Sequence, residues 1–250
     1  MKPNDKYLIK LWIPAIIIGL LAIYCIFASG NFGIILIPVV VAIVFMVLKI
    51  RSKNGVAKAL QHEDPSRLID TIVKPLKSSN SQKKTAECLM AYNTAISYVL
   101  YGEYKQAEDV MSRVDWASKE PMFQSLDRSI KSLIHLFSGN IHLGLSEARQ
   151  ARALATTSAF PGAQKSIDTY EAYIQIGQIL AGICHDEMLH SLEAKQQKLP
   201  LIPALIVAWG LVNGYHERNE LEQYRRMVEF CENNAPHCHP LRRLVSVNGD

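Results

Sequence analysis

No charged side chain occurs between Lys10 and Lys49. Residues 11–28 and 32–48 of this stretch are apolar, and each is about long enough to cross a ~30 Å hydrocarbon layer as a helix. A run of this length cannot be the core of a small soluble domain. It predicts two transmembrane helices, which form a membrane-anchoring hairpin within residues 1–54. Because neither span contains an ionisable residue, we expect no ion pathway through them.

Basic residues flank the two spans on both outer sides. They are Lys2, Lys6 and Lys10 before the first span, and Lys49, Arg51, Lys53 and Lys58 after the second. The connection between the spans is uncharged, so the positive-inside rule places both termini in the cytoplasm of a multi-pass cytoplasmic (inner) membrane protein. The alternative is a signal peptide cleaved near Ala28. Its apolar part would be longer than the usual 7–15 residues, and a second span follows at once.

The chain after the anchor lacks a basic excess. The formal net charge of +4 arises near the spans: residues 1–58 hold seven basic residues and one acid, and the remaining 192 residues sum to −2. This balance excludes an electrostatic basis for nucleic-acid binding. Five cysteines at irregular spacing are odd in number and form no disulfide framework. They are typical of reduced thiols in a cytosolic domain.

Strand-like alternation of Val, Ile and Thr is scarce from residue 56 onward, so we expect an all-α fold. Asp64 and Pro65 predict the start of a short helix over 65–76, within a linker region at 55–82. Prolines then recur at nearly regular intervals and separate blocks of 35–40 residues, each long enough for two antiparallel helices. The blocks are 83–117, 122–157, 163–198 and 203–235, with internal breaks at Gly102-Glu103, Gly139-Asn140, Gly182 and Arg218-Asn219. This period predicts an α-helical repeat array over 83–235 and a polar C-terminal tail over 236–250.

The first block resembles a tetratricopeptide repeat (TPR). Its segment 98–107 has a late aromatic Tyr98, a turn glycine Gly102, then Tyr104 and the small residue Ala107. The second block is similar, with Ser132 and Gly144 as the small contact residues, and the last block ends at Pro236. The last block departs from the pattern at Asn219 and Tyr224, and the third block fits poorly, with Glu187 where a small residue is expected. The resemblance implies a TPR-like solenoid of helical hairpins.

Recognisable catalytic motifs are missing. The chain has no G-x-S-x-G elbow, no phosphate-binding G-x-x-x-x-G-K-[ST] and no H-E-x-x-H. Glu187 and His190 have the spacing of one half of a di-iron site, but a second such pair does not occur. His185 lies about 140° from His190 on a helix, so these side chains cannot converge on one metal.

A second cluster consists of Cys231, His237 and His239, whose side chains are suitable zinc ligands. A closed structural site needs a fourth ligand, and none is evident nearby. The simpler interpretation is a buried cysteine at the end of the last helix, followed by exposed polar residues. We therefore expect no metal, no cofactor and no catalytic residue.

What remains is a surface for another protein. The TPR resemblance places Tyr92 and Ile96 of the first block, and Trp209, Asn213 and His216 of the last, on the concave groove where such arrays bind partners. The sequence thus predicts a non-enzymatic, membrane-anchored scaffold that binds a protein partner at the membrane surface, with residues 11–48 in the lipid bilayer. Two alternatives remain: an accessory subunit that associates through the two spans, and a metal-dependent enzyme that uses one of the His/Glu or Cys/His clusters.

Overall fold

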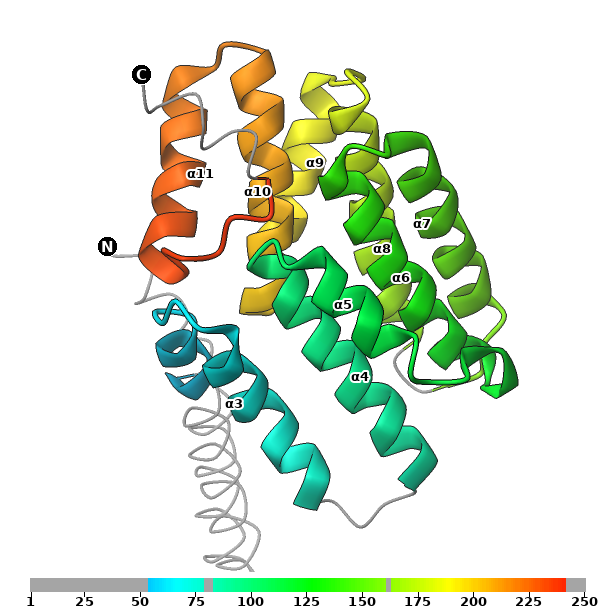
Figure 1. The fold of residues 1–250 in the computed structure, drawn as a ribbon. Helices are drawn as coiled ribbons and strands as arrows, with labels where there is room; N and C mark the ends of the chain where they lie inside the picture. The colour runs from blue at the N-terminus through cyan, green and yellow to red at the C-terminus, as the bar shows by residue number, and fades with distance from the viewer. Residues whose placement is uncertain (1–53, 79–82, 161–162, 242–250) are drawn as a thin grey trace, which may run out of the picture. The chain divides into compact units, whose positions relative to one another are not determined.

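The computed structural model describes residues 54–78, 83–160 and 163–241, and these residues are helical with no strand among them (Figure 1). The described part of the chain is therefore all-α. The chain divides into two units between Gly55 and Val56, and the fold below is that of the second unit. The predicted spans at 11–28 and 32–48 lie outside the described residues. None of the helices in the described ranges is both long and apolar enough to span a bilayer.

Helix α3, Pro65–Ser78, begins where the cap and proline predict. The carboxylate of Asp64 accepts a hydrogen bond of 2.8 Å from the backbone N–H of Ser66, which satisfies one of the free donors of the first turn. Pro65 occupies the first helical position, where no N–H is needed. Leu68 is fully buried, and α3 packs against α4.

The described residues from Lys83 onward form four helical hairpins. They are α4 (Lys83–Leu100) with α5 (Tyr104–Met111), α6 (Pro121–Ser138) with α7 (Ile141–Thr156), α8 (Ala163–Leu180) with α9 (Asp186–Gln196), and α10 (Leu201–Glu217) with α11 (Leu221–Asn234). A short 3-10 helix, η1 (Trp116–Ser118), precedes α6. Each hairpin matches one predicted block to within two residues at its start, and this includes the third block, which fits the repeat pattern poorly.

The four turns share one geometry. Their central residues, Gly102, Gly139, Gly182 and Asn219, all have positive φ. In the last turn the N–H of Glu220 donates to the carbonyl of Tyr215 at 2.9 Å, and that of Asn219 to His216 at 3.0 Å. This pair of bonds is the Schellman motif, and the other three turns repeat it. Glycine or asparagine at these positions ends each first helix because other residues are strained there.

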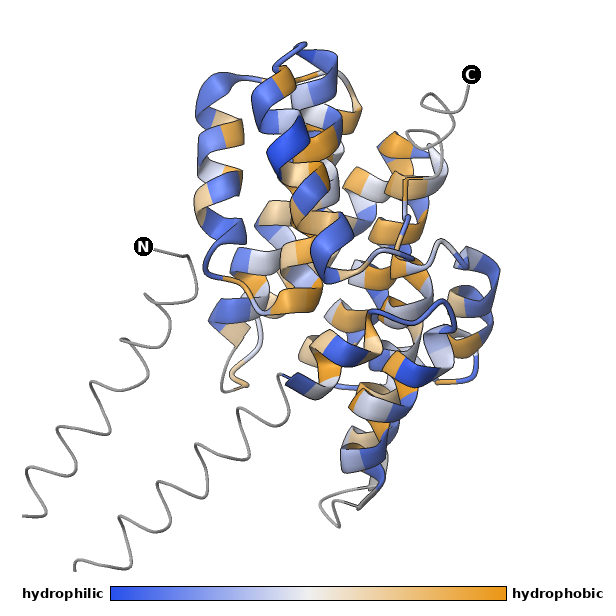
Figure 2. Ribbon diagram, turned by 90° about the vertical axis from the view of Figure 1, so that its left-hand side faces the viewer, coloured by the Kyte–Doolittle hydropathy of each residue, from blue (hydrophilic) through white to orange (hydrophobic). Residues whose placement is uncertain are grey.

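The first helices of the hairpins, α4, α6, α8 and α10, contact one another in that order, and we call them the first-helix layer. Helices α5, α7 and α9 each pack between their own partner and the next member of this layer (Figure 1). In Figure 2 the apolar residues of these helices lie mainly on the sides that meet other helices. Stacking thus buries faces that no single hairpin could cover.

Small residues allow the two helices of the second hairpin to approach closely, as the sequence predicts. The Ser132 hydroxyl donates to the Gly144 carbonyl at 2.8 Å across the α6–α7 contact. A Cβ atom at Gly144 would lie 2.7 Å from the side chain of Leu136 and 2.9 Å from its backbone nitrogen. Glycine is therefore required here by the distance between the helices.

The end of α11 contacts the segment that precedes α3. The side-chain amide of Gln61 donates to the backbone carbonyls of Asn233 and Asn234, at 3.2 and 3.1 Å, and so satisfies carbonyls at the end of α11. The chain beyond α11 differs from the expected polar tail in its described part, because Cys238 and Leu241 are fully buried. Both side chains belong to the same core as the helices.

Candidate functional site

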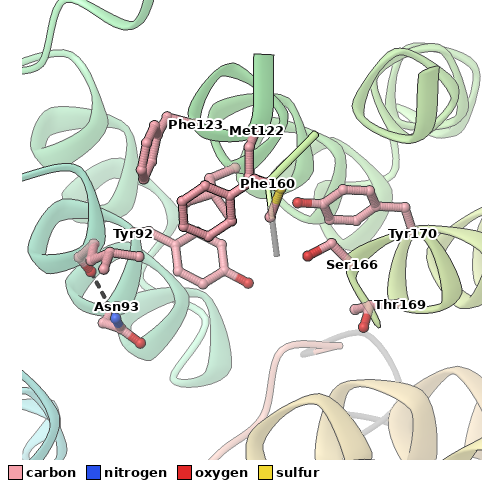
Figure 3. Close-up of a pocket in the computed structure, with 10 residues that line it drawn as sticks. Tyr92, Asn93, Met122, Phe123, Phe160, Ser166, Thr169 and Tyr170 are labelled. Carbon is pink, nitrogen blue, oxygen red and sulfur yellow. Dashed lines mark hydrogen bonds between the residues drawn. The ribbon is translucent and has the colours of Figure 1, made fainter. Parts of the chain in front are cut away.

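One hollow in the described part of the chain lies between three members of the first-helix layer. It has a volume of about 380 Å³, and Figure 3 shows most of its lining. Helix α4 contributes Leu89, Tyr92 and Asn93; α6 contributes Met122, Phe123 and Leu126; α8 contributes Ser166, Thr169 and Tyr170; and Phe160 comes from the connection between α7 and α8. We call this the α4–α6–α8 pocket.

Two phenylalanines form an apolar side of the pocket. Phe123 lies in the first turn of α6, and its ring meets that of Phe160 edge to face, with centroids 5.8 Å apart. Phe160 remains 42% exposed, and it is the member of the pair that faces solvent, since Phe123 is 7% exposed. The pair offers an apolar contact to a bound group. Because the two rings already pack against each other, little side-chain entropy is lost when that group binds.

Hydroxyl groups lie on the opposite side, beside α8 (Figure 3). The Tyr170 hydroxyl lies 3.0 Å from that of Ser125, and Ser125 donates its own proton to the carbonyl of Met122 at 2.7 Å. Tyr170 is therefore the donor of the pair. The nearby hydroxyl of Tyr173 is buried, and no described residue forms a hydrogen bond with it.

The phenols around the pocket stay neutral. Burial raises the pKa of Tyr92, of Tyr170 and of Tyr173, and the proximity of the other two phenols raises the pKa of Tyr173 further. The phenols of Tyr92 and Tyr170 therefore lie near that of Tyr173. They provide neutral donors and acceptors instead of a negative charge.

The described lining of the pocket is mainly apolar and carries no formally charged side chain. None of its described residues is Asp, Glu, His, Lys, Arg or Cys. It therefore offers no carboxylate, imidazole or amine as a general base beside its serine and threonine, and no cation for an anionic ligand. A mainly apolar wall with a few hydroxyl groups is suited to an apolar side chain that carries a neutral polar group.

The predicted partner-binding residues occupy different environments. Tyr92 lines the α4–α6–α8 pocket, whereas Ile96, one turn further along α4, is only 3% exposed. Trp209 and Asn213 are 5% and 2% exposed, and Asn213 donates to the carboxylate of Glu217 at 3.0 Å. His216 is exposed and packs on the ring of Tyr224, with centroids 5.6 Å apart. The structure thus does not bring the two predicted groups together in one site.

Neither the His/Glu cluster of α9 nor the Cys/His cluster after α11 brings three or more possible metal ligands together among the residues that the structure describes. His185 precedes the first turn of α9, and Asp186 pairs with Arg218. Cys231 lies in α11 and is fully buried, as is Cys238. Burial raises the pKa of both thiols, that of Cys238 to about 12, so neither is a ready thiolate ligand.

Comparison of the chain with protein-family models, with curated proteins and with solved structures finds no match. The functional assignment therefore depends on the geometry of the chain itself.

The sequence predicts one residue of the pocket, Tyr92, and does not predict its aromatic rim, the pair Phe123 and Phe160. Phe123 lies at the start of the second block, Phe160 lies between the second and third blocks, and Tyr170 lies in the third. A usable indication is present: Tyr92, Phe123 and Tyr170 all lie in the first halves of consecutive blocks, where the first helices are expected. Whether these residues meet in one pocket depends on the rotation between hairpins, which the sequence does not give.

Proposed function

We propose that this chain is a membrane-anchored scaffold of TPR-like helical hairpins that binds a protein partner at the membrane surface. The α4–α6–α8 pocket is its docking site for an apolar side chain of that partner. Residues 11–48 anchor the chain in the cytoplasmic membrane with both termini in the cytoplasm. Tethering then raises the effective concentration of the partner's binding site without any further contact.

The observation that supports this proposal most directly is the exposed aromatic rim of the pocket. Phe160 is 42% exposed beside Phe123, in a hollow of about 380 Å³ that lies across three successive hairpins. Aromatic side chains at the centre of a concave surface are the typical anchors of protein interfaces. The described lining has no carboxylate, imidazole, amine, guanidinium or thiol group, which favours binding over catalysis.

The repeat geometry supports the TPR-like interpretation. Each block forms two antiparallel helices joined by a turn with positive φ, and first helices stack on first helices. The small residues expected at the contact, Ser132 and Gly144, meet there. In such arrays the layer of first helices is the surface used for recognition.

Site-specific photocrosslinking of the full chain in native membranes tests the proposal. A photocrosslinking amino acid replaces Thr169 in the pocket, and a matched control replaces Arg149, an exposed residue of α7. We expect a discrete protein adduct from position 169 and none from position 149. Ser166→Trp, which fills the pocket from the neighbouring turn of α8, should abolish that adduct while the helical content stays unchanged.

Two results would contradict the proposed site. An adduct that survives Ser166→Trp would place the partner elsewhere. If association instead required residues 11–48 and was indifferent to pocket variants, the chain would be an accessory subunit that pairs through its spans.

A further inference from the structure

The segment that follows α11 is bound to the helical array as a peptide ligand would be. Residues 235–241 form neither helix nor strand, and two of them, Pro236 and Pro240, have no backbone N–H. Nevertheless Cys238 and Leu241 have no exposed surface. A non-helical segment with buried side chains needs a surface built to receive it. We call residues 235–241 the C-terminal segment.

Aromatic residues from both ends of the array form that surface. Tyr104, at the start of α5, donates a hydrogen bond to the carbonyl of Pro240. Trp209 of α10 meets the ring of His239 edge to face, with centroids 5.7 Å apart. Tyr101, at the end of α4, has a pKa raised first by burial and then by Cys238, so it lies beside that thiol. In Figure 1 the segment runs between α10–α11 on one side and the α4–α5 hairpin on the other.

The polar contacts of this surface leave one donor unused. The Nε1 of Trp209 is buried, and no described residue accepts a hydrogen bond from it. A buried indole N–H without an acceptor costs free energy, and buried Trp side chains usually have a partner. The segment as bound supplies no acceptor, so a peptide that placed a carbonyl beside this N–H would gain a hydrogen bond that the segment lacks.

We infer that Tyr101, Tyr104 and Trp209 form a second docking surface, whose ligand is an extended, proline-containing, largely uncharged peptide, and that the C-terminal segment is its intramolecular occupant. Grooves lined by aromatic residues bind proline-containing segments because such segments are already extended and lose little entropy on binding. The inference rests on the proposed function as a protein-binding array. It concerns a different surface, so variants of the α4–α6–α8 pocket serve as controls.

The segment has the properties of a displaceable occupant. The N–H of Cys238 donates within the segment, to the carbonyl of Ala235 at 3.1 Å, and the side chains of Cys238 and Leu241 are fully buried in the core of the array. It is held mainly by side-chain burial, which a competing peptide of similar shape could reproduce. The tether gives it an effective concentration of about millimolar order, so a partner in trans must bind more tightly or be held nearby.

Peptide binding in trans tests the inference. A fluorescent peptide with the sequence of residues 235–241 is titrated against the full chain and against the same chain ending at Asn234, with anisotropy as the readout. We expect saturable binding to the shortened chain and binding at least about tenfold weaker to the full chain, where the site is occupied. Trp209→Ala in the shortened chain should abolish binding, and Ser166→Trp in the pocket should leave it unchanged. A helical shortened chain that does not bind the peptide would overturn the inference.

A second measurement covers the case in which the shortened chain fails to fold. Cys238 in the full chain is labelled with a maleimide in short pulses, and Cys88, buried in α4, is the reference. Leu241→Asn should accelerate labelling of Cys238 at least about tenfold without changing that of Cys88, because it releases the segment and leaves the helices folded. If the two cysteines are labelled at the same rate in this variant, the segment opens only with the whole array and is not a displaceable ligand.

Discussion

At the scale of single residues, the two buried tyrosines of α8 differ in what their hydroxyl groups contact. The hydroxyl of Tyr170 lies 3.0 Å from that of Ser125, whereas that of Tyr173 has no hydrogen-bond partner among the described residues. A satisfied buried hydroxyl contributes about 0.5–1.5 kcal/mol, and an unsatisfied one costs about 1–3 kcal/mol. Both residues are almost completely buried. The same chemical change should therefore have different consequences at the two positions.

Tyr170→Phe should lower the free energy of unfolding by about 1 kcal/mol, because the hydrogen bond to Ser125 is lost. Tyr173→Phe should leave it unchanged or raise it by up to about 1 kcal/mol, because the substitution removes an unpaired polar atom and keeps the ring. Urea unfolding followed by circular dichroism measures both variants against the parent chain. Equal losses at the two positions would mean that Tyr173 has an acceptor.

At the scale of helices, most of the hairpin architecture could be predicted from the sequence. The four turns form at the predicted breaks because each has a glycine or asparagine where the backbone is left-handed. The third block resembles the repeat pattern poorly, and it still forms α8 and α9. Glu187, which departs from the pattern, is exposed in the first turn of α9 and lies at no close helix contact. Its size is therefore of no consequence.

The contacts between hairpins could not be predicted in the same way. Whether Tyr92 and Trp209 share a groove depends on the rotation from one hairpin to the next, which the repeat period does not define. Trp209 is instead covered by the C-terminal segment, whose burial depends on surfaces from α4, α5 and α10. Phe160 lies outside every predicted helix, so no helical period could assign it to the pocket.

The turn between α10 and α11 provides a test at this scale. Asn219 has φ of 58°, the one non-glycine residue with positive φ among those described. Asn219→Ala should lower the free energy of unfolding by about 1–2 kcal/mol, because a Cβ without a local hydrogen bond is strained there. Asn219→Gly should be neutral or slightly stabilising.

The control for this test is Arg225→Gly on the exposed face of α11, which should cost about 1 kcal/mol. Thermal or urea unfolding distinguishes the three variants. A loss at Asn219→Gly as large as that at Arg225→Gly would show that the turn does not need a left-handed residue.

At the scale of the whole molecule, the charges are distributed in two regions. Seven of the 27 basic residues lie within residues 1–58, around two apolar runs, and the rest of the chain sums to a slight negative charge. Attachment to a membrane could therefore arise in two ways. The apolar runs could insert into the bilayer, or the lysines and arginines could bind anionic lipid headgroups at about 1 kcal/mol each. The two modes respond differently to salt.

We expect the full chain to remain in the membrane fraction after washes with high salt and with alkaline carbonate, because insertion of residues 11–28 and 32–48 is insensitive to screening. The chain that begins at residue 55 should appear in the supernatant at every salt concentration, since its basic residues do not exceed its acids. Replacing Lys49, Arg51 and Lys53 by Gln provides the control: it should change the topology and leave the attachment intact, because the positive-inside rule governs orientation. Release of the full chain by salt alone would identify the basic flanks as the attachment, and a scaffold held that way could leave the membrane whenever those charges were neutralised.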